Sequence, residues 1–210
     1  MRRSARAWFG LTALVVAVGL AVQVHAVAEL HTGFFDSNAK RIANIFCFFT
    51  IWSNVLVGLT FAVLAIRLDR GSVVFRTVYL SAVLMIAVTF VVVIVALDPL
   101  ADYEGTAAVA DFLTHKLVPV MAVGGWLVFG PRRMVSPPVI RLSLVVPVVW
   151  LAFTLARGPL ARNYYPYPFV NVATLGYGRV LLNVALVTAL FFALALAASW
   201  LDSALARDPA

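Results

Sequence analysis

Six long apolar stretches constrain this chain more than any other feature of its sequence. A helix needs about 20 mostly apolar residues to cross the hydrocarbon core of a bilayer. Stretches of that length, or slightly shorter ones extended by their flanks, predict spans at 7–28, 42–66, 75–97, 111–131, 138–156 and 177–201. Every backbone polar group in lipid must be satisfied within the protein, so we expect an all-α fold. The prediction is one transmembrane domain over residues 1–210, a polytopic membrane protein with six transmembrane helices in one bundle.

The composition excludes an ordinary soluble domain. Hydrophobic residues make up 63% of the chain and charged residues 12%, whereas soluble domains have roughly 45–50% and about 25%. The formal net charge is +7, but the charges fall between the apolar stretches. That placement indicates basic loops at a membrane surface, so we expect the bilayer as a partner and no nucleic acid. The sequence predicts no particular oligomeric state.

The distribution of basic residues predicts that both termini are cytoplasmic. With the N-terminus inside, the inside segments hold ten of the 16 Lys and Arg residues, namely Arg2, Arg3, Arg6, Arg67, Arg70, Arg76, Arg132, Arg133, Arg141 and Arg207. Positive charge is enriched on the cytoplasmic side of membrane proteins. Frequent arginine and scarce lysine favour a bacterial source, and hence the cytoplasmic (inner) membrane. The first stretch also resembles a secretory signal peptide, although its 7–28 uncharged run is long for one.

Polar side chains in the second expected span are the first candidates for chemistry. Cys47, Thr50, Ser53 and Asn54 follow helical spacing and share one face, which we expect to point into the bundle. A structural interpretation stays open, because Ser and Thr in membrane helices often bond the carbonyl four residues earlier or join two helices. Asn54 is costlier to bury and needs a specific partner.

His115 gives the polar face of the second span a possible catalytic partner. It lies about one turn into the fourth expected span, at the same predicted depth as Thr50. A hydroxyl beside an imidazole is the minimal nucleophile–base pair of hydrolytic enzymes. A histidine satisfied at the membrane interface is the structural alternative.

Four basic residues are expected near the outer ends of these spans: Lys40, Arg41, Lys116 and Arg179. Each could simply anchor the protein at lipid headgroups. Arg179 is the best candidate for holding the polar end of a bound lipid, with Asn183 one turn deeper as a second substrate-binding residue. The aromatic run at 164–169 suits an interfacial belt.

Several well-known motifs are missing from the sequence. It contains no P-loop, no Gly-rich dinucleotide fingerprint, no GxSxG elbow and no HExxH. We therefore expect no cofactor and no metal. A haem or metal site on His25 and His115 is kept as a lesser alternative.

Three segments together resemble the bacterial Pr6Pr family of membrane proteins. They read FCFFTIWSN at 46–54, HKLVP at 115–119 with WLVFGP at 126–131, and YPYPF at 165–169 with GYGRV at 176–180. The segments occur in this order across the second to sixth expected spans. That family looks distantly related to the androgen-induced and androgen-dependent transmembrane threonine hydrolases, which cleave fatty acid esters of hydroxy fatty acids.

The resemblance implies a function and a site. By position, Thr50 matches the nucleophile of those hydrolases and His115 the base. In such a reaction we expect Ser53, Asn54 or backbone amides to steady the oxyanion. The leading hypothesis is thus an intramembrane lipid-ester hydrolase; the alternative is a lipid-binding or helper protein without turnover. Two positions depart from the pattern, because Gly125 and Asn171 stand where the resemblance leads us to expect acidic residues.

Overall fold

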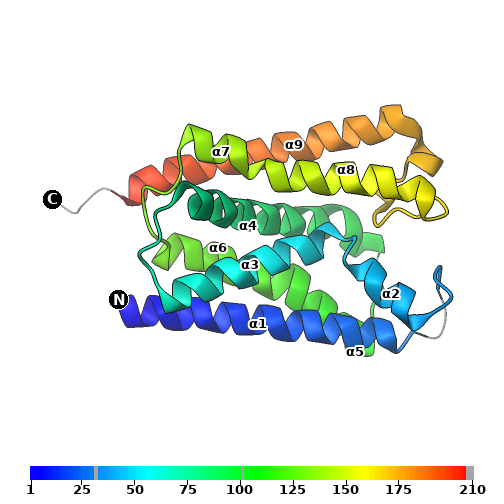
Figure 1. The fold of residues 1–210 in the computed structure, drawn as a ribbon, viewed down its shortest axis with the longest axis horizontal. Coiled ribbons are helices and arrows are strands. Elements are labelled where there is room, and N and C mark those ends of the chain that lie inside the picture. Colours follow the sequence, from blue (N-terminus) through cyan, green and yellow to red (C-terminus); the bar gives the residue numbers. More distant parts are fainter. Residues whose placement is uncertain (31–32, 101, 207–210) are drawn as a thin grey trace.

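All regular secondary structure in the described residues, 1–30, 33–100 and 102–206, is helical in the computed structural model of this protein (Figure 1). Six segments are long and apolar enough to cross a membrane: Arg2–Ala28, Phe49–Ile66, Val73–Leu97, Gly105–Phe129, Pro137–Leu160 and Val172–Leu205. The prediction of an all-helical chain with six such segments is confirmed.

The helices follow one another in a simple order. They are α1 (Arg2–Ala28), α2 (Asn38–Ile45), α3 (Phe49–Ile66), α4 (Val73–Val92), η1 (Val93–Leu97), η2 (Asp98–Leu100), α5 (Gly105–Asp111), η3 (Phe112–Leu117), α6 (Val118–Phe129), α7 (Pro137–Ser143), α8 (Val145–Leu160), η4 (Pro168–Val170) and α9 (Val172–Leu205). The segments η1 and η3 are π-helical, whereas η2 and η4 are 3₁₀ turns.

The bundle is built around α4, the most buried of the spans. Helices α3, α6, α7 and α9 all contact it, and α1 packs against α3 and α5. The start of α1 and the end of α9 lie at one end of the bundle, which we call the terminal end (Figure 1). The opposite end, called the far end below, carries α2, α5 and the connection between α8 and α9.

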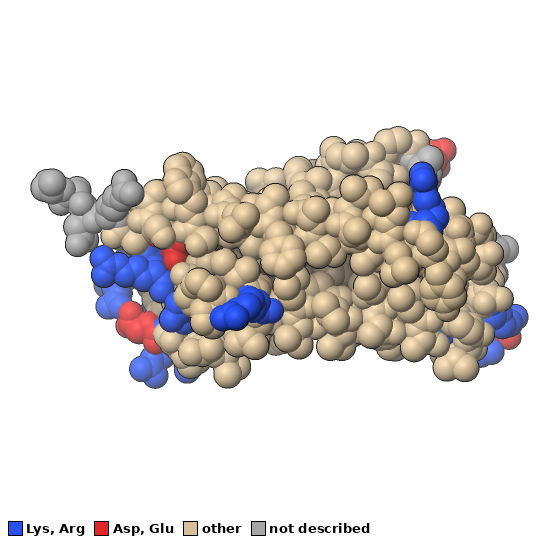
Figure 2. All heavy atoms as spheres, turned by 90° about the horizontal axis from the view of Figure 1, so that it is seen from above, with Lys and Arg blue, Asp and Glu red and all other residues tan. Residues whose placement is uncertain are grey.

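On the face of the bundle seen in Figure 2, most Lys, Arg, Asp and Glu side chains gather towards the two ends. Large apolar side chains are exposed along several helices, for example Leu14, Val120, Leu186 and Leu196. In water such a surface would be an association site. In a bilayer it faces lipid, so the arrangement is that of a membrane protein.

The second expected span, 42–66, is not one helix. α2 ends at Ile45, Phe48 is extended with φ −81° and ψ 134°, and α3 begins at Phe49. A broken helix leaves carbonyls without intrahelical partners, and these must be satisfied. Two indole groups do so here. Trp52 Nε1 donates to the carbonyl of Phe46 at 2.8 Å, and Trp150 Nε1 donates to that of Cys47 at 2.9 Å.

The other spans are close to their expected ranges, with local differences. The fifth starts with α7, and Leu144 separates it from α8. In the sixth, α9 begins at Val172 rather than at 177, but it is kinked at Gly176, whose φ of 72° is left-handed. Glycine adopts that conformation without steric cost. The straight part of the helix therefore begins beside the predicted boundary.

Gly125, one of the two departures noted above, is explained by close packing between α6 and α1. A Cβ at this position would lie 2.5 Å from Nε1 of Trp8. The indole is fixed, since Nε1 donates to the carbonyl of Met121 at 3.0 Å. An acidic side chain has no room at this position, because the indole of Trp8 occupies the space.

We predict that Gly125→Ala lowers stability whereas Gly124→Ala does not. The first change forces Trp8 to move, and overpacking of this kind costs about 1–3 kcal/mol. A Cβ at Gly124 meets nothing within 4 Å, and there alanine favours the helix by up to ~1 kcal/mol. Thermal unfolding of both variants in detergent measures the difference. Equal melting temperatures would contradict the packing described here.

Candidate active site

Thr50 lies at the start of α3, where its amide and its hydroxyl both bond side chains from other parts of the chain. It is the second residue of the helix and is buried, with 4% of its surface exposed. The break after α2 thus determines which backbone groups surround it. Its Oγ lies 3.0 Å from Nε2 of His115 and 3.2 Å from the hydroxyl of Tyr167.

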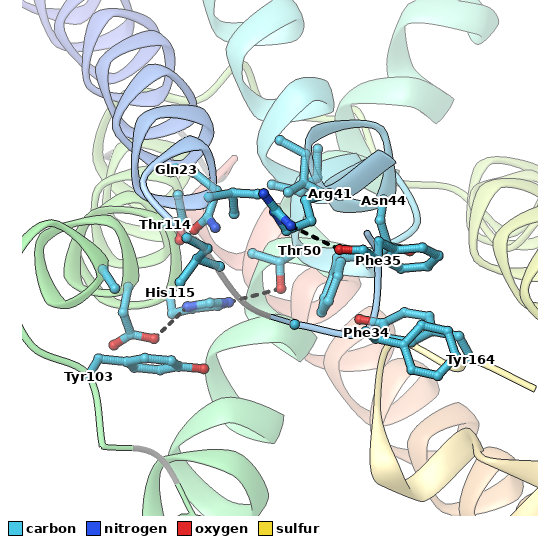
Figure 3. A pocket seen from close by; sticks show the side chains of 18 residues that line it. Gln23, Phe34, Phe35, Arg41, Asn44, Thr50, Tyr103, Thr114, His115 and Tyr164 are labelled. Atoms are coloured by element: carbon cyan, nitrogen blue, oxygen red, sulfur yellow. Dashed lines mark hydrogen bonds and ion pairs between the residues drawn. The ribbon is translucent and has the colours of Figure 1, made fainter. Parts of the chain in front are cut away.

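His115 lies on the π-helical segment η3 and is held from both ring nitrogens (Figure 3). Its Nδ1 is 2.8 Å from Oδ1 of Asp111, one turn earlier. An ionised carboxylate only accepts hydrogen bonds, so Nδ1 carries the proton and Nε2 of the neutral ring is an acceptor. The Thr50 hydroxyl then donates to Nε2. Hydroxyl, imidazole and carboxylate are therefore in series.

Asp111 is also paired on its second oxygen. Nζ of Lys116 lies 3.0 Å from Oδ2 of Asp111 and 3.2 Å from a carboxylate oxygen of Asp98. Asp98 follows η1 at the end of the third span. A buried carboxylate is costly unless it is paired and hydrogen-bonded. These contacts meet that requirement, and they join the ends of two spans at the far end of the bundle.

Ser53 and Asn54 support Thr50 from within the bundle and do not line the cavity described below. Ser53 Oγ donates to the carbonyl of Thr50 at 2.9 Å and lies 3.2 Å from Oγ1 of Thr89. Asn54 Nδ2 donates to the carbonyls of Thr50 at 2.9 Å and of Thr114 at 3.1 Å. Both side chains join helices.

The contact to Thr114 has a specific reason. In η3, each amide bonds the carbonyl five residues earlier, as Val118 does to Leu113. The next amide would be that of residue 119, but Pro119 has no N–H. Asn54 supplies the missing donor to the Thr114 carbonyl. It thereby supports the backbone immediately before His115.

Arg179 and Asn183 are not brought to Thr50. Arg179 is exposed at the beginning of α9, and neither residue lines the cavity beside Thr50. Asn183 Nδ2 donates to the carbonyl of Phe169 at 2.9 Å, which ties α9 to η4. The two residues lie on α9, whereas the wall of that cavity is built from α1, α2, α3, α5, η3 and the loops of the far end.

Tyr167 is a site residue that no pattern in the sequence predicted. It comes from the loop between α8 and α9, and we expected its aromatic run to lie in an interfacial belt. Tyr167 is instead 7% exposed, stacked on Phe169 with ring centroids 5.3 Å apart. Its hydroxyl accepts from the amide of Thr50 at 3.2 Å, and burial raises the pKa of this phenol to about 12. The protonated hydroxyl can therefore donate to Thr50 Oγ.

A cavity of about 320 Å³ opens beside Thr50 and His115. Most of its wall is apolar or aromatic, including Phe34, Phe48 and Tyr164. A smaller apolar cavity of about 60 Å³ touches Thr50 from the side of Tyr167. Apolar walls of this kind suit a hydrocarbon chain, and Thr50 lines both cavities.

Asn171, the second position where the resemblance led us to expect an acidic residue, caps a helix as aspartate often does. Its Oδ1 accepts from the amide of Thr174 at 3.3 Å and so caps α9. Asparagine and aspartate are similarly good N-cap residues. The missing acid is replaced at this position without loss of the cap.

His25 and His115 have separate partners. His25 is exposed on α1, with Nε2 3.4 Å from a carboxylate oxygen of Glu29, while His115 is engaged by Thr50 and Asp111. Within residues 1–30, 33–100 and 102–206, no group of three or more His, Cys, Asp or Glu residues could hold a metal ion.

Asp111 and Tyr167 were not predicted as site residues. The sequence contains a signal for Asp111 but none for Tyr167. Asp111 and His115 are four residues apart, the spacing at which helical side chains meet. Tyr167 is 117 residues from Thr50. Comparison with known proteins adds nothing further, because no protein-family model, curated protein or solved structure matches this chain.

We predict that Asn54→Ala destabilises the protein more than Thr60→Ala. Removing the amide of Asn54 leaves the Thr114 carbonyl buried without a donor, at a cost of about 1–3 kcal/mol. Thr60 is also buried on α3, but its hydroxyl bonds only the carbonyls of Leu56 and Val57 on its own helix. Thermal unfolding in detergent provides the comparison. Equal losses would contradict the assigned role of Asn54.

Proposed function

We propose that this protein hydrolyses carboxylic esters of lipids within the membrane, with Thr50 as the nucleophile and His115 as the base. One observation carries the proposal: Thr50 Oγ, His115 and Asp111 are linked by contacts of 3.0 and 2.8 Å beside a cavity with apolar walls. Hydroxyl, imidazole and carboxylate in this order form the working parts of many hydrolases. The substrate class suggested by the family resemblance is a fatty acid ester of a hydroxy fatty acid.

The first step is attack on the ester carbonyl. His115 Nε2 takes the proton of the Thr50 hydroxyl while Oγ forms a bond to the carbonyl carbon. Asp111 accepts from Nδ1, and its charge favours the imidazolium that forms. When the tetrahedral intermediate collapses, the bond to the leaving alcohol breaks and Nε2 returns the proton to that oxygen. Thr50 is then acylated.

Two donors are suitably placed for the oxyanion of that intermediate. The hydroxyl of Tyr167 lies 3.2 Å from Oγ, and the amide of Thr50, which donates to that hydroxyl in the resting site, would exchange this bond for one to the oxyanion. Thr50 is also in the first turn of α3, where the helix dipole favours negative charge. One well-placed donor lowers such a barrier by about 3–4 kcal/mol.

Water completes the cycle. A water molecule attacks the acyl carbon while His115 Nε2 takes one of its protons. On collapse the bond from the acyl carbon to Thr50 Oγ breaks, and Nε2 gives that proton to Oγ. The free fatty acid and the intact hydroxyl are the products. Because the cavity lies at the far end of the bundle, water has only a short path from the membrane surface.

The charge distribution supports an orientation. We propose that the terminal end faces the cytoplasm of a bacterial cell and that the far end, with Thr50, lies in the outer half of the cytoplasmic membrane. A lipid ester would then enter from the outer leaflet.

Covalent labelling tests the proposal directly. A lipophilic fluorophosphonate is expected to label the purified protein, because Thr50 Oγ attacks phosphorus and displaces fluoride. Thr50→Ala and His115→Ala should lose the label. Thr60→Ala changes a threonine two to three turns deeper on the same helix and should keep it. Mass spectrometry of the labelled peptide and thermal unfolding of each variant complete the measurement.

Two outcomes would overturn the hydrolase. One is a label that survives Thr50→Ala, and the other is an unlabelled wild-type protein that also fails to cleave acyl-ester probes. The second outcome would favour the alternative function, a lipid-binding or helper protein in which Thr50 joins helices.

Tyr167→Phe tests the oxyanion assignment. Removing the hydroxyl is expected to lower kcat about 10²- to 10³-fold and to leave KM nearly unchanged, because the donor acts on the transition state. The ring contacts remain, so the loop should keep its packing. If an acyl-ester probe is cleaved at the wild-type kcat, the hydroxyl of Tyr167 has no catalytic part.

A further inference from the structure

The cavity beside Thr50 contains a guanidinium group that forms no ion pair with any Asp or Glu of the described residues. Arg41 lies on α2 and lines the same cavity as Thr50 and His115 (Figure 3). Its Nη1 donates to the carbonyl of Phe35 at 2.9 Å, and its Nη2 donates to Oδ1 of Asn38 at 2.6 Å. Both acceptors are uncharged. Among the residues that the structure describes, no Asp or Glu forms an ion pair with Arg41.

The third side of the same guanidinium is buried without a partner. Nε of Arg41 has no hydrogen-bond acceptor in the described parts of the chain. A buried donor without an acceptor is unfavourable, more so on a charged group. Guanidinium groups bind the paired oxygens of carboxylates and phosphates with a geometry that neutral groups do not match. Arg41 is thus held in place by two neutral contacts while its charge stays uncompensated.

The helical face of α2 explains why this cation lies inside and its neighbour does not. Arg41, Asn44 and Ile45 are three and four residues apart and line the cavity together. Lys40 lies outside this cavity, where Nζ pairs with a carboxylate oxygen of Asp36 at 2.9 Å. Two adjacent basic residues therefore have different surroundings, one paired in solvent and one unpaired in the cavity.

A second donor, Asn44, lines the cavity together with Arg41. Oδ1 of Asn44 accepts from Nη2 of Arg157 at 2.9 Å, so the amide nitrogen of Asn44 is a donor. Arg157 in turn lies 5.9 Å from the ring centres of Phe35 and Tyr164. Arg157 does not line this cavity, so Arg41 supplies its positive charge beside the aromatic rings of Phe35 and Tyr164.

We propose that Arg41 binds the anionic head group, a carboxylate or a phosphate, of the lipid whose ester Thr50 attacks. This inference rests on the proposed function and names the substrate class, an amphiphile with one negative end. Apolar walls hold the hydrocarbon part, and the unpaired guanidinium selects the charge. Arg41 takes the role that the sequence suggested for Arg179.

Binding of three amphiphiles that contain no carboxylic ester tests the site without any turnover. The probes are tritium-labelled oleate, oleyl phosphate and oleyl alcohol, measured by equilibrium dialysis against wild-type protein in a non-ionic detergent. We expect at least one anionic probe to bind about 10- to 100-fold more tightly than the alcohol. Tighter oleate identifies a carboxylate as the natural head group, and tighter oleyl phosphate identifies a phosphate.

Variants on α2 separate charge in the cavity from charge at the surface. Arg41→Met is expected to remove the preference for the anionic probes, whereas Lys40→Met, the matched control, keeps it. Arg41→Gln retains a polar side chain and serves if the methionine variant unfolds; it too should lose the preference. Equal binding of all three probes by the wild type, or a preference that survives both Arg41 variants, would overturn the inference.

Cleavage of paired probes distinguishes this inference from the proposed function. If no ester is cleaved but anionic binding depends on Arg41, the hydrolase is wrong and the head-group site stands. If neutral and carboxylate-bearing acyl esters are cleaved with equal kcat/KM, the hydrolase stands and the role of Arg41 is wrong. Lys40→Met should match the wild type in both assays.

Discussion

The break between α2 and α3 is the feature on which the rest of the site depends. A continuous helix over 42–66 would bury the amide and carbonyl of Thr50 in its own ladder. The break instead places Thr50 in a first turn, with its amide available to Tyr167 and its hydroxyl to His115. It also turns α2 into a separate short helix that closes the cavity. In an apolar environment such a break persists only if the released carbonyls find donors, which the indole groups of Trp52 and Trp150 provide.

The need to satisfy every backbone carbonyl within an apolar environment also accounts for the irregular fourth span. Pro119 cannot donate to the carbonyl of Thr114, and the donor comes from Asn54 on α3. The π-helical turn that precedes Pro119 carries His115 on the side of Thr50. Wider turns of this kind are common at functional sites, because they redirect a side chain without ending the helix. Two irregular segments, each satisfied by a side chain from another helix, thus bring the reacting groups together.

The sequence alone predicted the spans but not the contacts between distant residues that form the site. Length and hydropathy predicted the six spans, because crossing lipid imposes both on any helix. They could not predict the break at Phe46–Phe48, since its donors include a tryptophan about a hundred residues away. Thr50 and His115 could be selected as polar residues in apolar spans, and Asp111 was within reach through its spacing from His115. Arg179 was selected for its position along the chain, whereas Arg41 faces the cavity only because α2 is a separate helix.

The charges of the far end form one graded series that makes the site tolerable within a bundle of apolar helices. Asp98 and Lys116 are partly exposed, Asp111 and His115 are mostly buried, and Thr50 is almost fully buried. Each group is bonded to the next, so no isolated charge is buried and the desolvation penalty is shared by paired groups. Asp111 can therefore carry a negative charge next to the imidazole even though it lies within a span. Arg41 is the exception to this pairing, and a charge left open in an otherwise compensated cavity is the arrangement that a site for an oppositely charged ligand requires.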